Sequence, residues 1–170
     1  DEEGRVFVAD TGNHRIQVFD GEGQWLRSYG AKGDGPREFN APAGIAASNG
    51  LVYIADTGNG RVQILTADGV FVKQITAKVA REEMKSPSGV AVDVQNRVYV
   101  LDAGSNRVRV FDSSGTQVLA FGTRGTGVEG FEKPQGIAVD GRGNIYVVDT
   151  GNYKIKKFDG QGKLLGSIGS

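Results

Sequence analysis

The feature that most constrains this chain is a four-residue turn sequence that recurs at a regular spacing. Asp10-Thr11-Gly12-Asn13 returns as Asp56-Thr57-Gly58-Asn59, weakens to Asp102-Ala103-Gly104-Ser105 and is restored as Asp149-Thr150-Gly151-Asn152. The leading aspartates stand 46, 46 and 47 residues apart in a chain of 170 residues. A period between about 20 and 50 residues is typical of repeat architectures. We therefore expect four copies of one structural unit.

Each unit contains short runs rich in β-branched and aromatic residues, separated by turn residues. The first unit has three such runs, at 5–9, 15–20 and 24–30. The later units add a run in front that begins with Pro and carries small residues, at 42–47, 87–93 and 134–140. Runs of this kind predict β-strands. We name the four strands of a full unit a, b, c and d, and expect the first unit to lack strand a.

The size of the side chains changes across each unit. Strand a has Ala46, Ala91 and Ala138 in one column, whereas strand b carries bulkier runs such as Val52-Tyr53-Ile54. Small inner strands suit blades that converge on an axis, and four-stranded units at this spacing indicate a β-propeller. A solenoid of β-turns would have a shorter repeat. We predict an all-β propeller segment with blades at 1–30, 39–75, 84–122 and 131–170.

The first blade is predicted to be incomplete. Residues 1–7 align with 140–146, so the chain begins at the last residue of a strand a. The missing strand would come from an upstream segment, from another molecule, or not at all. An arc left open in this way exposes sheet edges and apolar faces. Self-association through these edges is therefore one expected interaction.

Two stretches resemble the NHL repeat. They are residues 8–20 and the run 134–140 followed by 143–149. The resemblance covers the chain in four units and implies a propeller that usually has six blades. NHL propellers mostly serve as binding platforms for proteins or RNA, and related six-bladed propellers include lyases and lactonase-like hydrolases with metals in the central channel. The resemblance also favours an extracytoplasmic or bacterial cell-surface location.

The composition narrows the function classes. Lys plus Arg and Asp plus Glu both number 20, so the net charge of zero gives no bulk attraction for nucleic acid. The chain has no Cys, which excludes disulfides and thiolate chemistry. Its apolar runs are shorter than the roughly 18 residues of a membrane span.

Candidate catalytic groups are few. His14 is the only histidine, whereas a zinc site built from histidines needs several protein ligands. We therefore expect no catalytic residue, metal site or cofactor within these residues. The turn aspartates are interpreted as acceptors of backbone amides, aided by the basic residue five positions on. Asp1, Asp93 and Asp140 are interpreted in the same way, with a calcium site as the alternative.

The predicted strand directions place the b–c turns and the d–a crossovers at one end of the blades. The crossovers are 31–41, 76–86 and 123–133, and the second of them has a helix-compatible run at 77–85. Loops on a rigid scaffold commonly carry binding. We expect partner-binding residues at this end: His14, Arg37, Lys78, Arg81, Glu82, Glu83, Asn106 and Tyr153.

The most economical function is thus a non-catalytic scaffold that binds a protein through this loop face. One alternative is part of a propeller enzyme of the lyase or lactonase-like kind, with metal ligands outside this segment. Another is RNA binding, for which Lys154, Lys156 and Lys157 beside Tyr153 would supply the basic patch and the aromatic. The zero net charge and the scarcity of exposed aromatics disfavour that alternative.

Overall fold

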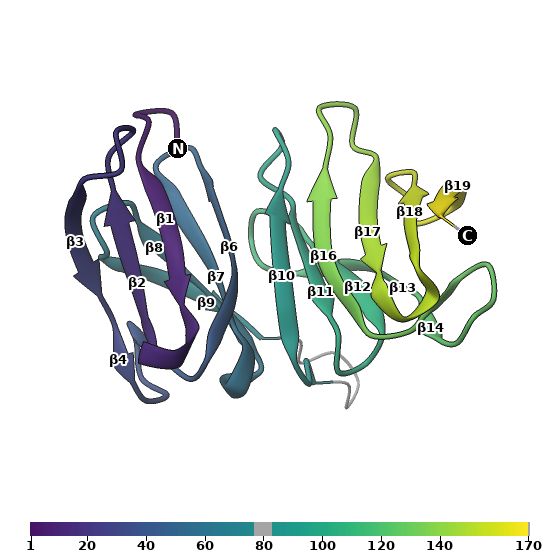
Figure 1. The fold of residues 1–170 in the computed structure, drawn as a ribbon, viewed down its shortest axis with the longest axis horizontal. Helices are drawn as coiled ribbons and strands as arrows, with labels where there is room; N and C mark the ends of the chain where they lie inside the picture. The colour runs from purple at the N-terminus through teal and green to yellow at the C-terminus, as the bar shows by residue number, and fades with distance from the viewer. Residues whose placement is uncertain (77–82, 170) are drawn as a thin grey trace.

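The computed structural model describes residues 1–76 and 83–169. They form four antiparallel sheets that follow one another along the chain (Figure 1). The first sheet, blade 1, has three strands: β1 (Val6–Asp10), β2 (Arg15–Phe19) and β3 (Trp25–Tyr29). The prediction that this blade lacks its inner strand is confirmed.

The other three blades have four strands each, in the order inner to outer. Blade 2 contains β6 (Pro42–Ser48), β7 (Leu51–Asp56), β8 (Arg61–Thr66) and β9 (Phe71–Ile75). Blade 3 contains β10 (Pro87–Val92), β11 (Val98–Asp102), β12 (Arg107–Phe111) and β13 (Gln117–Phe121). Blade 4 contains β16 (Pro134–Val139), β17 (Ile145–Asp149), β18 (Lys154–Phe158) and β19 (Leu164–Gly169).

The register within the blades repeats from one to the next. The inner strands β10 and β16 both begin with a proline opposite the turn aspartate, then shift register once before a glycine. Further along, Ala46, Ala91 and Ala138 each lie opposite a tyrosine of strand b. Small residues on strand a thus face large ones on strand b, as the side-chain pattern predicts.

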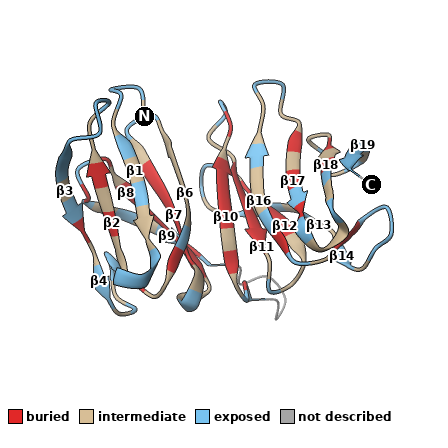
Figure 2. Cartoon of the chain, viewed as in Figure 1, coloured by how far each residue is buried: buried red, intermediate tan, exposed pale blue. Residues whose placement is uncertain are grey.

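The core lies between the blades and not inside any one sheet. Successive residues along a strand project alternately to the two blade faces, and Figure 2 shows the buried residues concentrated on the central strands. Three apolar clusters result, one for each pair of neighbouring blades. Their central members are Val18 with Ile54, Ile64 with Val100, and Val110 with Val147.

Neighbouring inner strands lie side by side along the axis, β6 beside β10 and β10 beside β16 (Figure 1). Gly44 permits the first of these approaches. A Cβ atom at Gly44 would lie 2.7 Å from the Cα atom of Gly89 and 2.8 Å from the carbonyl oxygen of Ser88. Because these neighbours are backbone atoms, they cannot rotate away. Gly44, which precedes Ile45 on β6, is thus required by the packing at this position.

Two of the crossovers are ordered by short parallel pairings. In the first, β4 (Ala31–Lys32) pairs with β5 (Glu38–Phe39), and in the third β14 (Thr123–Arg124) pairs with β15 (Gly130–Phe131). The phenylalanines of these crossovers are fully buried between blades. The helical turn expected at 77–85 falls largely on residues 77–82, which lie outside the described residues.

Candidate binding face at the loop end

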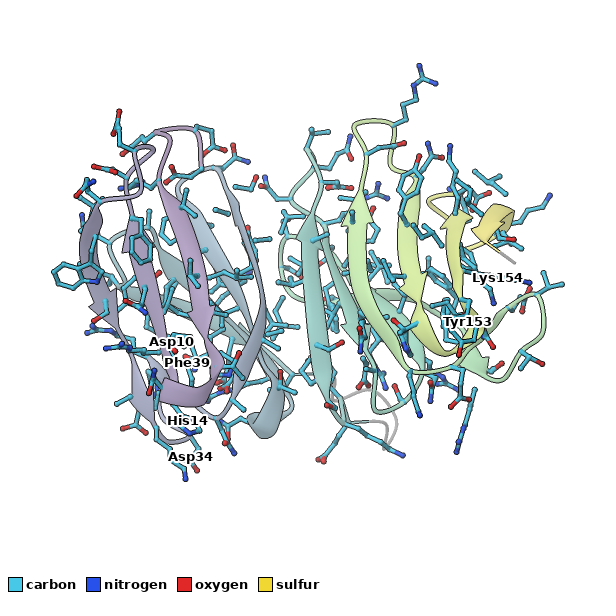
Figure 3. All side chains as sticks on the ribbon, in the orientation of Figure 1. Asp10, His14, Asp34, Phe39, Tyr153 and Lys154 are labelled. Atoms are coloured by element: carbon cyan, nitrogen blue, oxygen red, sulfur yellow. The ribbon has the colours of Figure 1, made fainter. Side chains whose placement is uncertain are left out.

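The b–c turns and the described parts of the d–a crossovers share one end of the blades, which we call the loop end. It lies at the bottom of Figure 1, and Figure 3 places His14 and Asp34 there on blades 1 and 2. Three of the b–c turns are single 3-10 turns: Thr11–Asn13, Thr57–Asn59 and Thr150–Asn152. The opposite end carries the a–b and c–d turns.

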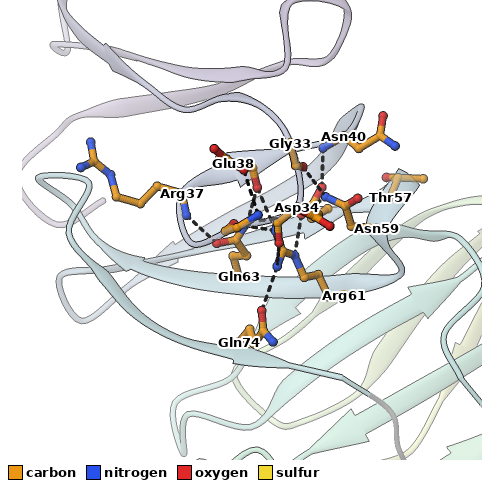
Figure 4. A network of polar contacts seen from close by, with 12 residues as sticks. Gly33, Asp34, Arg37, Glu38, Asn40, Thr57, Asn59, Arg61, Gln63 and Gln74 are labelled. Carbon is orange, nitrogen blue, oxygen red and sulfur yellow. Dashed lines mark hydrogen bonds and ion pairs between the residues drawn. The ribbon is translucent and has the colours of Figure 1, made fainter.

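The turn aspartate of blade 2 is the centre of a buried polar network (Figure 4). Asp56 is fully buried, and its carboxylate accepts hydrogen bonds from Arg61 Nε at 2.7 Å and from the Asn59 side-chain amide at 2.9 Å. It also accepts one from the backbone N–H of Asn40 at 2.7 Å. The carboxylate therefore ties the b–c turn to the crossover that precedes the blade.

Arg61 completes this attachment. Its guanidinium donates to the carbonyl oxygens of Asp34, Gly35 and Glu38 at 2.6, 2.8 and 2.9 Å. A buried arginine stays charged and offers five donors in a fixed plane, so it can satisfy several loop carbonyls at once. The crossover 31–41 is held on blade 2 as a rigid loop.

The same arrangement recurs in blades 3 and 4, where the cation comes from another position of strand c. Asp102 accepts from the backbone N–H of Ser86 at 2.9 Å and from Arg109 Nε at 3.2 Å. Asp149 accepts from the backbone N–H of Glu132 at 2.7 Å and lies 3.1 Å from Lys156 Nζ. Asp56, Asp102 and Asp149 are thus backbone acceptors, as interpreted, but the amides belong to the crossovers and not to the turns. Asp10 differs, because within the described residues it accepts from the side chains of Asn13, Arg15 and Gln17 alone.

The position of the cation needs a correction. The basic residue five positions on is the partner in blade 1, with Arg15 at 2.8 Å from Asp10, and in blade 2. In blade 4 the expected Lys154 is replaced by Lys156, seven positions on. Positions five and seven on lie on the same side of strand c, because side chains alternate along a strand. Either can therefore reach the carboxylate.

The residue after each turn adopts a left-handed backbone conformation. His14, Gly60, Asn106 and Tyr153 have φ values of 55°, 61°, 53° and 56°. Glycine and asparagine tolerate this region, but for a bulky residue it is strained. The His14 ring accepts a hydrogen bond at Nδ1 from the backbone N–H of Ala41 at 3.0 Å, so this side chain helps to fix the first crossover.

Tyr153 differs from His14 because, among the described residues, its side chain makes no hydrogen bond to a crossover. Its ring is 80% exposed at the loop end of blade 4 (Figure 3). Asn106, in the same position of blade 3, is half-buried. A strained backbone under an exposed aromatic ring marks Tyr153 as the most prominent side chain of the loop end.

The remaining predicted site residues lie on the crossovers. The backbone N–H of Arg37 donates to Gln63 Oε1 at 3.0 Å, while its side chain points away from the network (Figure 4). Glu83 is exposed, and its carbonyl oxygen accepts from Arg109 at 3.4 Å. Lys78, Arg81 and Glu82 lie outside the described residues.

The aspartates that end strand a lie in turns at the opposite end. Asp140 Oδ1 accepts from the backbone N–H groups of Arg142 and Asn144, both at 2.9 Å. Its Oδ2 accepts from the Asn144 side chain and the Tyr146 hydroxyl. These hydrogen bonds, that of the Asn144 side chain foremost, lower the pKa of Asp140 to about 2. Asp93 is bonded similarly by Arg97 and Tyr99.

Two chemical features bear on the alternative functions. Within the described residues, no three His, Cys, Asp or Glu side chains are grouped so that they could hold a metal ion. In the basic run, Lys156 is buried and donates to the carbonyl oxygens of Gly127 and Gly130, while Lys157 Nζ lies 5.4 Å from the centre of the Tyr146 ring. The run is therefore not a continuous exposed basic patch. No helix of the described residues is long and apolar enough to span a membrane.

Sequence reasoning missed an exposed aromatic at the other end of the molecule. Trp25, the only tryptophan, is exposed at the start of β3 in blade 1. Its position in strand d was visible from the repeat, because outer strands are covered on fewer sides than inner ones.

Several solved structures share this fold. A streptogramin B lyase structure matches with a TM-score of 0.74 and 16% identity, over 99% of this chain and 52% of its own. Virginiamycin B lyase from Staphylococcus aureus, with quinupristin, matches with a TM-score of 0.73 and 18% identity, over 99% of this chain and 53% of its own. A chain of a nidogen/laminin complex matches with a TM-score of 0.75 and 18% identity, over 98% of this chain and 60% of its own. At these identities the likeness shows the fold alone.

The chain spans little more than half the length of these structures. Among curated proteins, the RING finger protein nhl-1 of Caenorhabditis elegans is 40% identical over 45 residues, which is 26% of this chain and 5% of that protein.

Family models agree with the geometry of the blades. An NHL repeat model matches residues 1–19 and 39–65, which contain the b and c strands of the first two blades. A model described as a 6-bladed beta-propeller matches residues 81–168, just over half of the chain. The chain therefore belongs to the 6-bladed β-propeller family and carries NHL repeats.

Proposed function

We propose that this chain is a non-catalytic binding module that contacts a protein partner through its loop end. The observation that carries the proposal is Tyr153, whose ring is 80% exposed on a backbone with a φ of 56°. Blade 2 has Gly60 in the same position, where this conformation carries no steric penalty. Residues with a strained backbone cluster at functional sites.

The rest of the loop end supports a pre-organised binding surface. The first and third crossovers are fixed by buried aspartates and cations, so they lose little conformational freedom on binding. Arg37 has its backbone held by Gln63 while its side chain remains exposed. Tyrosine and arginine are the residue types that most often dominate the energetics of protein interfaces.

The proposal is tested by partner capture with two aromatic variants. The immobilised chain is exposed to an extract of the organism that encodes it, and captured proteins are quantified for the wild type, Tyr153→Gly and Trp25→Ser. We expect Tyr153→Gly to reduce capture of the specific partner at least tenfold and Trp25→Ser to leave it unchanged. Trp25 is a suitable control because it is exposed at the opposite end.

Three results would count against the proposal. Capture that survives Tyr153→Gly but fails with Trp25→Ser would place the binding face elsewhere. Capture of RNA in place of protein, with an affinity that falls steeply with salt, would favour the nucleic-acid alternative. Turnover of a lyase or lactone substrate by the chain would favour the enzyme alternative.

A further inference from the structure

A cavity of about 240 Å³ lies between blades 2 and 3, where the a–b and c–d turns meet. We call it the inter-blade cavity. Its lining is mostly apolar, with Leu51, Ile64 and Ile75 from blade 2 and Val98 from blade 3, and it includes the ring of Tyr53. Both blades have all four strands, so the described walls of the cavity are complete sheets.

The cavity exists because one side chain of strand d is smaller than its counterparts. The strand register places three residues of blades 1, 2 and 3 in one column: Tyr29, Ile75 and Phe121. Each packs on the c–d turn of the next blade. A Cβ atom on Gly69 or Gly162 would lie 2.7 Å from the ring of Tyr29 or Phe121, whereas one on Gly115 would lie 3.6 Å from Ile75. An aromatic ring therefore fills this space at the two neighbouring junctions, and blade 2 lacks it.

The tyrosine of strand b has also lost its partner in blade 2. The Tyr99 hydroxyl donates to Asp93 at 2.9 Å, and the equivalent pair in blade 4 does the same at 3.1 Å. Blade 2 has Ser48 in place of this aspartate, and among the described residues the Tyr53 hydroxyl has no hydrogen-bond partner. Tyr53 is only 3% exposed. Because a buried hydroxyl without a partner is unfavourable, a ligand that accepts its hydrogen bond would be stabilised.

The Tyr53 hydroxyl is placed to donate into the cavity. The Tyr99 side chain reaches the a–b turn of its own blade, and the shared register gives Tyr53 the same direction. The a–b turn residues Asn49 and Asn96 line the cavity at this end, where their side chains are joined by a hydrogen bond of 2.9 Å. Burial raises the pKa of Tyr53 above its ordinary 10.0, so the hydroxyl keeps its proton at neutral pH.

A third change makes the same region apolar. In blade 3 the Arg97 side chain donates to Asp93, and in blade 4 the Asn144 side chain donates to the equivalent carboxylate. Leu51 occupies this position in blade 2. The polar pair of the other blades is thus replaced by a serine and an apolar wall. All three changes, at residues 48, 51 and 75, fall in the one blade that lines the cavity with strands b and d.

The charged groups at the rim already have partners. Lys73 Nζ donates to the carbonyl oxygen of Ser113 at 2.6 Å. The Asp112 carboxylate accepts from the backbone N–H groups of Ser114 and Thr116, both at 2.9 Å. Since both charges are used within the protein, the cavity favours an uncharged ligand.

The size and shape of the cavity indicate the kind of ligand. An apolar protein cavity of about 150 Å³ accepts benzene, so this one has room for a substituted ring. We propose that the inter-blade cavity binds a small uncharged molecule with one aromatic ring and one hydrogen-bond acceptor. The ring occupies the space that Tyr29 and Phe121 fill at the neighbouring junctions. The acceptor receives the hydrogen bond of the Tyr53 hydroxyl.

The test is an NMR titration of the purified chain with two probes of similar size. Acetophenone carries an acceptor on its ring substituent, and ethylbenzene carries none. We expect saturable shifts of the Ile75 and Val98 methyl resonances with acetophenone. Tyr53→Phe should weaken acetophenone binding about fivefold, the value of one hydrogen bond, and leave ethylbenzene binding unchanged.

A second pair of variants tests the space itself. Ile75→Phe restores the ring of the neighbouring junctions and should abolish binding of both probes. Ile168→Phe is the matched control, because Ile168 occupies the same column in blade 4 and is 77% exposed. It should leave both affinities unchanged. Thermal unfolding establishes that each variant is folded, and Leu51→Phe, which also narrows the cavity, replaces Ile75→Phe if that variant does not fold.

Several outcomes would overturn the proposal. They are shifts that do not saturate, shifts that map to other residues, and acetophenone binding that survives Ile75→Phe. An equal effect of Tyr53→Phe on both probes would also contradict it, because the hydroxyl would then play no part as a donor. The Tyr153 capture assay is independent of all these results, since Tyr153 lies at the loop end and outside the cavity.

Discussion

Blades 1 and 2 carry the same turn residues and use them differently. Asp10 and Asp56 both begin an Asp-Thr-Gly-Asn turn and both bind an arginine five positions on. In blade 2 a crossover covers the pair, and the carboxylate becomes a buried junction between loop and sheet. In blade 1 nothing in the described residues covers it, and the pair is a partly exposed ion pair. The difference teaches that the energetic weight of a repeated residue depends on what packs over it.

The largest expected effect comes from removing the two carboxylates. Asp56→Ala should lower the free energy of unfolding by about 3–5 kcal/mol, because it leaves buried Arg61 without its charge partner. Asp10→Ala should cause a much smaller loss, because water solvates the exposed partner. Urea unfolding of both variants measures the contrast. Equal losses would show that the uncovered Asp10–Arg15 pair is as tightly coupled to the fold as the covered Asp56–Arg61 pair.

A second contrast concerns the inner strands. Gly44→Ala should lower the free energy of unfolding by about 1–3 kcal/mol, since its Cβ meets the backbone of β10. Gly136→Ala on β16 should change it by less than about 0.5 kcal/mol. There the nearest atom to a new Cβ is a methyl group of Val148, at 3.2 Å. Thermal unfolding compares the two variants, and a larger loss at Gly136 would contradict this account of the axis.

A third contrast concerns the hydroxyl groups that join successive blades. Thr57 Oγ1 donates to the carbonyl oxygen of Pro87 in the next blade at 2.7 Å, and Thr11 does the same to Pro42. Thr57→Val should cost about 0.5–1.5 kcal/mol, the net value of one hydrogen bond. Thr150→Val on blade 4, an exposed residue whose hydroxyl makes no hydrogen bond within the described residues, should cost close to nothing. A matching loss at both positions would mean that the hydroxyl stabilises the turn itself.

The smallest expected effect is on the pKa of Asp10. The hydrogen bond from Arg15 is the main cause that lowers the pKa of Asp10 below its ordinary 3.8. A lowered folded-state pKa stabilises the fold above about pH 3.9, and that contribution is lost as the pH falls through the folded-state value. Arg15→Gln should therefore raise the pKa of Asp10 toward 3.8, as measured from its carboxyl resonance by NMR. An unchanged pKa would show that Asn13 and Gln17 hold the carboxylate without the arginine.

Much of this architecture was predictable because it depends on local patterns in the sequence. The 46- and 47-residue spacing gives the number of blades, and the missing Pro-x-Gly run gives the three strands of blade 1. The placement of the b–c turns and crossovers at one end follows from alternating strand directions. The structural role of the turn aspartates follows from their presence in every unit.

The details of the candidate site were harder to predict. The left-handed conformation of His14 and Tyr153 had a signal in the sequence, because Gly60 occupies the same position. The buried state of Phe39 and Phe131 had none, because both lie in glycine-rich crossovers that were interpreted as binding loops. The choice between cations five and seven positions on is also invisible in one strand, since both project from the same face.

The sequence by itself determined the repeat, the strand order and the incomplete first blade, because these depend on residues that are neighbours along the chain. Only the tertiary structure decided which aspartate is buried, which lysine forms a buried ion pair and which aromatic ring is exposed. Those properties depend on segments that come from other blades. Asp10 and Asp56 have the same local sequence and opposite surroundings, because burial belongs to the packing over a residue and not to the residue.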